Sequence, residues 1–162
     1  MSLLPQLQNF PPLKMPHKTL KIMKDVMYRY AKMELEQFAI FEENMKDEHA
    51  EIQVQTEAQF KYDKPQNVLC SKITVTFSIG ESPLMRAVID SYFLIHPDSI
   101  RGITDSEGHI IFPTNVLVQF ASLNYGSLRG IIHLKTLGTK LSGYILPPIF
   151  FNDIITKEYI AE

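Results

Sequence analysis

The feature that most constrains the fold is a strict alternation of polar and apolar residues between Glu51 and Tyr62. The set on one side of this run is Ile52, Val54, Thr56, Ala58, Phe60 and Tyr62, and the set on the other is Glu51, Gln53, Gln55, Glu57, Gln59 and Lys61. A period of two residues places each set on its own face of a strand. The run therefore predicts a long strand with one buried face and one wet face.

Two further strands follow, separated by the turn residues 63–67 and 80–83. The second strand covers about 69–79 and has Leu69, Ser71, Ile73, Val75, Phe77 and Ile79 on one face. The third covers about 84–96 and has Met85, Ala87, Ile89, Ser91, Phe93 and Ile95 on one face. Short polar turns between long strands predict hairpins, so the middle of the chain is expected to form an antiparallel meander.

The N-terminal part of the chain is less regular. Residues 1–17 contain Pro5, Pro11, Pro12 and Pro16, which exclude a regular helix or a central strand and predict an extended arm. Residues 18–41 fit a helical stripe through Leu20, Met23, Met27, Tyr30 and Glu34. They also fit a strand pattern through Leu20, Ile22, Val26, Tyr28 and Tyr30. Periodicity leaves both readings of this segment open.

Helical signals appear after the strands. Pro113 opens a predicted helix that runs to about Leu137, where Gly138 ends it. Asn152 is expected to cap a short last helix through Tyr159. Strands followed by helices indicate an α+β domain with helices on one face of an antiparallel sheet. A length of 162 residues favours one such domain, over 18–162, preceded by the arm.

Composition and motifs exclude several classes of function. A net charge of -2 argues against a nucleic-acid binder that works by bulk charge. The single cysteine, Cys70, excludes an internal disulfide framework, and the chain has no HExxH, GxSxG, Walker A or GxGxxG motif. His109 lies near Asp105 and Glu107, a pattern more common in ordinary loops than in metal sites. We therefore expect no enzyme, no catalytic residue, no metal and no cofactor.

The sequence also bears on the cellular compartment of the protein. The first twelve residues lack a basic start and an uninterrupted apolar stretch, so a signal peptide is not expected. The uncharged stretch 108–128 contains Pro113, Asn115, Gln119, Ser122 and Asn124, which are costly in a membrane. We expect a cytoplasmic protein that does not insert into membranes.

Small residues recur on one side of the predicted long helix. Ser122, Gly126 and Gly130 are four residues apart and therefore share one helix face. Each interior glycine costs a helix about 1 kcal/mol relative to alanine, so a close backbone contact is expected to compensate. That contact is made either by the molecule's own sheet or by the helix of a second subunit.

A second unusual segment covers 141–151. Its large apolar residues are Tyr144, Ile145, Leu146, Ile149, Phe150 and Phe151, and Pro147 and Pro148 stiffen it. Either these side chains close the core beneath the helix, or they line an exposed groove. An exposed apolar surface of this kind usually binds proteins or extended peptides.

The order of these elements resembles the SecB-like chaperones. The most similar stretch is Ser127–Asp153, with an Arg-Gly in the long helix, Thr136-Leu137-Gly138-Thr139 after it and Leu146-Pro147-Pro148-Ile149 ahead of the last helix. Lys24-Asp25-Val26 is similar to the Lys-Asp-Val of the family's first strand, which favours a strand over residues 18–30. The resemblance implies a four-stranded antiparallel sheet backed by one long and one short helix.

The resemblance also implies a function. Members of this family bind unfolded, export-competent polypeptides in apolar grooves without ATP, and they form homodimers or homotetramers. The groove would be lined by Phe112 and by Tyr144, Ile145, Leu146, Ile149, Phe150 and Phe151, and Ser122, Gly126 and Gly130 would serve the subunit contact. The protein partner would be the SecA motor or an antitoxin.

One departure weighs against SecA. The export chaperones carry Ser-Phe-Glu after the first-strand Asp-Val, whereas this chain has Met27-Tyr28-Arg29, which leaves Asp90 as a possible acidic docking residue. The alternatives to an unfolded-protein chaperone are an interaction module for one partner, such as an antitoxin, and a small ligand-binding domain.

Overall fold

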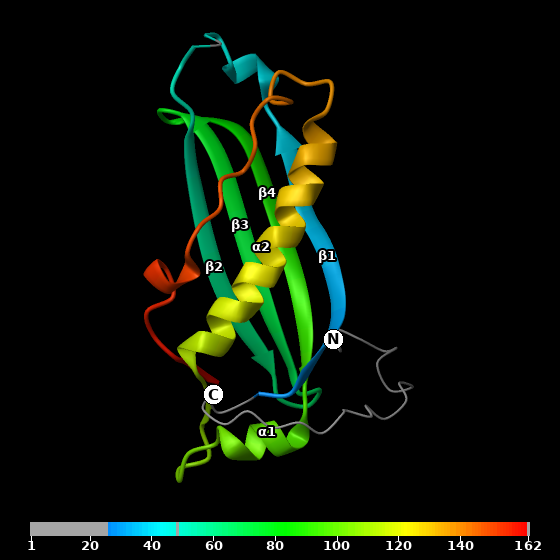
Figure 1. Cartoon of the computed structure of the whole chain (residues 1–162), viewed down its shortest axis with the longest axis vertical. Coiled ribbons are helices and arrows are strands. Elements are labelled where there is room, and N and C mark those ends of the chain that lie inside the picture. The colour runs from blue at the N-terminus through cyan, green and yellow to red at the C-terminus, as the bar shows by residue number, and fades with distance from the viewer. Residues whose placement is uncertain (1–25, 48, 162) are drawn as a thin grey trace.

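The computed structural model describes residues 26–47 and 49–161, and the predicted arm at 1–17 lies outside them. The body is a four-stranded antiparallel sheet in the order β1-β4-β3-β2 (Figure 1). Its strands are β1 (Tyr28–Ile40), β2 (Gln53–Asp63), β3 (Val68–Ile79) and β4 (Ser82–Ile95). The predicted α+β class with a four-stranded antiparallel sheet is confirmed.

The first strand resolves the ambiguity between helix and strand for residues 28–40, and residues 18–25 of that prediction lie outside the described part of the chain. β1 is a strand, and it pairs with β4 rather than with β2. The predicted meander therefore holds for β2, β3 and β4, while the chain crosses the end of the sheet after β1 through a short turn, η2 (Glu42–Asn44). Register shifts at Tyr30/Lys32 and Leu35/Gln37 interrupt the alternation along β1, which explains why its sequence pattern is mixed.

The predicted long helix is present as α2 (Thr114–Thr136), and Gly138 follows it with a left-handed φ of 79°. Figure 1 shows α2 crossing the sheet diagonally. Its packing includes a stacked pair of rings from Phe93 and Phe120, with centroids 3.9 Å apart. The fully buried Asn124 accepts a hydrogen bond from the Ser91 hydroxyl (2.6 Å) and donates one to the Ser71 carbonyl (2.6 Å), which fixes the helix to the centre of the sheet.

The short last helix predicted through Tyr159 is wrong. The chain makes a single 3₁₀ turn, η3 (Phe151–Asp153), and then forms a strand, β6 (Tyr159–Ala161), that pairs with β5 (Ile110–Phe112). The intervening Ile154, Ile155 and Thr156 are β-branched, which disfavours helix continuation. A short helix that the sequence did not indicate, α1 (Pro97–Gly102), follows β4.

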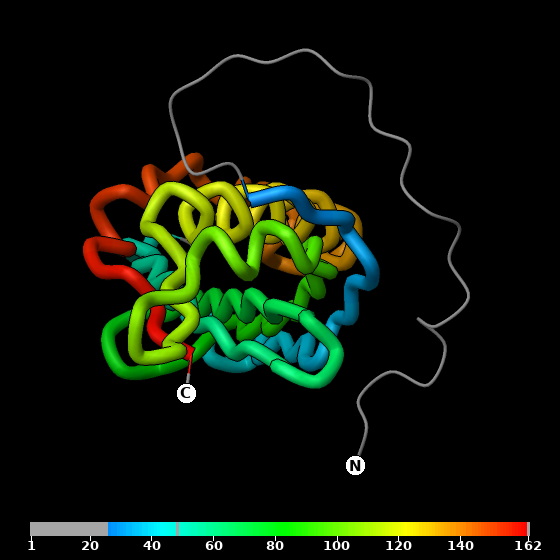
Figure 2. The backbone as a smooth tube through the Cα atoms, turned by 90° about the horizontal axis from the view of Figure 1, so that it is seen from below, coloured from blue at the N-terminus to red at the C-terminus, as the bar shows by residue number. Residues whose placement is uncertain are grey.

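These elements form two layers. Figure 2 looks along the long axis of the molecule and shows α2 and the segment that follows it in one layer, with the strands in the other. The core lies between the layers and includes Leu69, Ile73, Ile89, Leu117 and Leu128, all essentially inaccessible. Among the described helices, none has the length and apolar character needed to span a membrane.

Candidate functional site

The apolar segment 141–151 leaves the end of α2 and returns along the sheet toward η3, on the β2 side of the molecule (Figure 1). Two side chains of α2 hold it. The Tyr125 hydroxyl donates to the Pro147 carbonyl (2.6 Å), and Arg129 Nε donates to the Leu146 carbonyl (3.0 Å). Both bonds hold backbone carbonyls next to Pro147 and Pro148, so the position of this segment is fixed. We refer to residues 141–151 as the wall segment.

The surroundings of Tyr125 show that it packs tightly between α2 and the segment 141–151. Burial raises the pKa of its hydroxyl, while a hydrogen bond with the Thr56 side chain and the positive charge of Arg129 act in the opposite direction. Its ring also meets the Phe151 ring edge-on, with centroids 5.5 Å apart. Tyr125 therefore connects α2, β2 and the wall.

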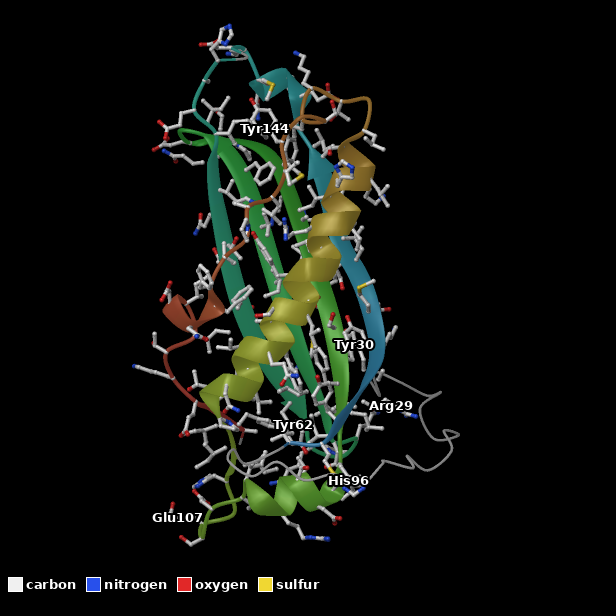
Figure 3. All side chains as sticks on the ribbon, in the orientation of Figure 1. Arg29, Tyr30, Tyr62, His96, Glu107 and Tyr144 are labelled. Atoms are coloured by element: carbon white, nitrogen blue, oxygen red, sulfur yellow. The ribbon has the colours of Figure 1, made fainter. Side chains whose placement is uncertain are left out.

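The structure divides the seven predicted groove residues into three groups. Phe112, Leu146 and Phe151 lie in the core, at most 2% exposed, where a bound polypeptide cannot reach them. Tyr144, labelled in Figure 3, and Ile149 are half-buried against the core. Ile145 and Phe150 point outward and are 71% and 80% exposed. Part of this segment therefore closes the core, as the first explanation holds, and part of it is exposed, as the second requires.

Sequence reasoning missed three further exposed apolar side chains on the same side of the molecule. They are Val54 on β2, Ile154 after η3 and Ile160 on β6. We refer to Val54, Ile145, Phe150, Ile154 and Ile160 as the β2-side surface. Figure 1 shows that the elements carrying them are spread along the length of β2. Val54 lies on the predicted dry face of its strand, and only knowledge that β2 is an edge strand would have indicated its exposure.

The outer edge of β2 has unpaired backbone groups. The backbone N–H of Tyr62 donates outward to the Tyr159 hydroxyl (3.1 Å), away from β3. In an antiparallel pair, every second residue points its N–H and C=O in the same direction. Val54, Thr56, Ala58 and Phe60 therefore also direct their backbone groups outward, and none of these groups has a partner among the described residues.

The predicted oligomer residues are open to solvent. Ser122, Gly126 and Gly130 are exposed, and a Cβ added at either glycine would meet no atom within 4 Å. The alternative in which this face packs on the molecule's own sheet is therefore excluded. Apolar residues accompany the three: Leu123, Leu134 and Leu137 are 43%, 67% and 57% exposed. We refer to these six residues as the α2 stripe.

The opposite face of the sheet carries a shallow concavity of about 440 Å³, lined in part by Cys70, Lys72, Asp90 and Tyr92. Lys72 Nζ lies 2.6 Å from a carboxylate oxygen of Glu36 and 3.6 Å from one of Asp90. Burial raises the pKa of the Cys70 thiol to about 12, so this thiol is poorly suited to act as a nucleophile. Burial likewise raises the pKa of Asp90, whose side chain is only 6% exposed and is therefore not available as a surface acid for docking.

The histidine loop has a structural explanation. Asp105 Oδ1 accepts hydrogen bonds from the backbone N–H groups of Glu107 (2.9 Å) and His109 (2.8 Å). Its other oxygen lies 3.1 Å from His109 Nδ1, and these bonds lower the pKa of Asp105. The carboxylate therefore closes a tight loop before β5, as expected of aspartate in turns.

Comparison with known proteins supports the fold. No protein-family model matches the sequence, and no curated protein matches it. Among solved structures, the chain is similar to a SecB-like chaperone from Mycobacterium tuberculosis in complex with a ChAD peptide from the HigA1 antitoxin. The TM-score is 0.51 at 10% sequence identity, and the match covers 75% of this chain and 90% of that one. The chain therefore has a SecB-like fold.

Proposed function

We propose that this protein is an ATP-independent chaperone of the cytoplasm that holds unfolded polypeptides on the β2-side surface. The observation that carries the proposal is the contrast within the wall segment. Leu146 and Phe151 are buried and the backbone is clamped by α2, yet the neighbouring Ile145 and Phe150 are held in solvent. A fixed segment that exposes large apolar groups has the character of a binding surface.

The energetics suit loose recognition of many sequences. Full burial of a Phe, Leu or Ile side chain is worth about 1.5–3 kcal/mol. The exposed apolar residues lie on several elements along β2 (Figure 1), so one extended chain can contact more than one of them. Several modest contacts along one chain add up to useful affinity without a requirement for a particular sequence. No covalent step is needed.

Binding to a permanently unfolded protein tests this function. We expect a reduced, carboxymethylated and fluorescently labelled client to show a saturable rise in anisotropy without nucleotide. The double variant Ile145→Ser, Phe150→Ser should bind at least about tenfold more weakly, since the lost burial exceeds 1.4 kcal/mol. Met33→Ser is the matched control, because Met33 is also exposed (44%) but lies on β1, at the other edge of the sheet. Equal binding by all three proteins would overturn the proposal.

A second candidate function is a dedicated contact with one partner, such as an antitoxin. It is favoured by the structural neighbour, which was solved with an antitoxin peptide bound. Recovery of a single stoichiometric partner by affinity capture would support it, whereas many different unfolded chains would support the general chaperone. SecA is the weaker partner hypothesis, because Asp90 is buried and Arg29 stands in the stretch where the export chaperones carry an acid.

Self-association is the remaining part of the proposal. The α2 stripe combines two glycines that permit close approach with three exposed leucines, and we propose it as the contact in a homodimer or homotetramer. Light scattering after size exclusion should give a multiple of 18.6 kDa. Leu134→Lys with Leu137→Lys should lower that mass, and Glu107→Lys, on a distant exposed loop, should not. A single-chain mass for the unaltered protein would exclude the contact.

A further inference from the structure

The predicted arm has the composition of the polypeptides that the proposed function would hold. Large apolar residues are spread along its sequence and just past the middle of it, at Leu3, Leu4, Leu7, Phe10, Leu13 and Met15. The prolines among them favour an extended backbone and exclude a regular helix, so these side chains cannot be buried by a helix of the arm itself. Burial of large apolar groups then requires an exposed apolar surface elsewhere on the molecule.

The charges of the chain are divided between its start and its body. Residues 1–25 contain four lysines and one aspartate, a formal charge of +3, so the remaining residues carry -5 within the total of -2. On the β2-side surface, the exposed acids Asp153 and Glu158 lie on either side of Ile154, and Lys157 is the single basic residue of this stretch. Opposite charge therefore favours contact between the lysine-bearing residues 14–24 and this part of the body.

The α2 stripe is the other exposed apolar surface, and its surroundings have the wrong charge for the same contact. Leu134 and Leu137 are well exposed, but Lys135 and Lys140 are exposed beside them. These lysines have the same sign as those of residues 14–24 and would repel them. The β2-side surface is therefore the better match to the start of the chain.

The place where this segment joins the fold lies at the β6 end of the sheet. β1 starts at Tyr28, and β2 ends there too, at Asp63, because the strands alternate in direction across the sheet. The hydrogen bond from the Tyr62 N–H to the Tyr159 hydroxyl (3.1 Å) holds β6 beside that end of β2. Figure 1 shows the blue start of β1 and the red end of the chain at the same end of the sheet. Three strand spacings, about 15 Å, separate the two edges.

The remaining residues are long enough to bridge this separation. The twelve residues 14–25 span up to about 40 Å when extended, more than twice the width of the sheet. A tether of this length holds the segment before it at an effective concentration in the millimolar range. A segment with a Kd of about 0.1 mM as a separate peptide would then occupy the surface in about nine molecules of ten. Weak binding is therefore sufficient for docking within one chain.

We infer that residues 3–13 dock on the exposed apolar side chains of the β2-side surface of their own chain, and that a client must displace them. The inference rests on the proposed function and concerns its regulation. The lysine-bearing residues 14–24 pass the acids Asp153 and Glu158 in this arrangement. Ile145 and Phe150 are held in place by the clamp from α2, so the surface is formed as soon as the segment leaves. The apparent affinity for a client is lowered in proportion to the fraction of molecules whose surface is free.

Client binding by full-length variants tests the regulation. The apolar variant combines Leu3→Ser, Leu4→Ser, Leu7→Ser and Phe10→Ser, and the matched control combines Gln6→Ser, Gln8→Ser and Asn9→Ser. The carboxymethylated client should bind the apolar variant at least about fivefold more tightly than the unaltered protein, because its surface is no longer occupied, and should bind the control as before. Equal binding by all three proteins would overturn the inference and leave the proposed function intact. Absence of binding by all three would overturn both.

A nitroxide spin label on the arm gives an independent measurement without a client. The label is attached at Gln8→Cys in a chain whose own cysteine is removed by Cys70→Ser. The methyl resonances of Ile145 and Ile154 should broaden far more than that of Met33, which lies at the other edge of the sheet. Equal broadening at the three sites would overturn the inference. So would broadening in a mixture where the spin label and the isotopic label are on different chains, since it would assign the contact to a second copy.

Discussion

The Tyr125 hydroxyl donates a 2.6 Å hydrogen bond to the carbonyl of Pro147 and thereby joins the middle of α2 to the wall segment. Arg129 lies four positions after Tyr125 and donates to the preceding carbonyl, that of Leu146 (3.0 Å). Residues four apart share one face of a helix, so one face of α2 acts as a clamp for the two carbonyls. The orientation of Ile145 and Phe150 depends on this clamp.

Tyr125→Phe should lower the free energy of unfolding by about 1–3 kcal/mol, because it leaves the Pro147 carbonyl without its donor while keeping the ring against Phe151. Urea denaturation measures the change. Tyr144→Phe removes a hydroxyl with no partner among the described residues and should change stability by less than about 0.5 kcal/mol. Similar losses in the two variants would contradict the clamp.

Asn124→Ala should be more damaging than its size suggests. The side chain is fully buried, and its loss removes its hydrogen bonds with the Ser91 hydroxyl and the Ser71 carbonyl, at about 0.5–1.5 kcal/mol for each bond. The Ser91 hydroxyl keeps its hydrogen bond with the Tyr30 hydroxyl. Ser127→Ala, on the half-exposed side of the same helix, should cost less than about 0.5 kcal/mol. Thermal or urea unfolding of both variants checks the difference, and a tolerant Asn124 site would show that the helix is held by apolar packing alone.

Asp90 predicts a pH dependence of stability. Burial raises the pKa of this carboxyl above its ordinary value of 3.8, so the folded state binds the proton more tightly than the unfolded state. The stabilisation is therefore complete below about pH 3.8 and is lost as pH rises through the folded-state pKa. Subtracting the urea midpoints of Asp90→Asn from those of the unaltered protein between pH 3.5 and 7 should reveal this loss. Glu81→Gln, exposed in the β3–β4 turn, should show no such trend.

Two glycine variants should move stability in opposite directions. Gly130→Ala places a methyl group in open space on α2 and should raise the free energy of unfolding of a single chain by about 0.5–1 kcal/mol. Gly138→Ala forces alanine into a φ of 79° and should lower it by about 1 kcal/mol or more. Unfolding should be followed at several protein concentrations. A Gly130→Ala variant that loses stability only at high concentration would indicate that the α2 stripe is buried between subunits.

Local periodicity accounts for much of this fold. The alternation through β2, β3 and β4 and the helical segment that ends before Gly138 were readable because each long element repeats its own pattern. The β5–β6 pair was not, because it joins residues about fifty positions apart through only three residues each. β1 was ambiguous because its bulges break the period. Non-local pairing of this kind leaves little trace in a single sequence.

The candidate site was less predictable for a related reason. The segment 141–151 has no repeat, so its apolar content indicated an unusual surface without separating buried Leu146 from exposed Ile145. The open edge of β2 depends on where β1 pairs, and the outward direction of its backbone depends on register with β3. The pairing of β1 and the register of β2 with β3 are properties of the folded sheet and cannot be read from the sequence of β2.

The most direct test of the central claim is protection of an aggregating client. Light scattering of a chemically unfolded client, diluted from denaturant without nucleotide, should fall as the protein is added in stoichiometric amounts. The double variant Ile145→Ser, Phe150→Ser, which changes residues 71% and 80% exposed, should fold normally and lose most of this protection, and Met33→Ser should keep it. Undiminished aggregation in the presence of the unaltered protein, or full protection by the double variant, would contradict the account.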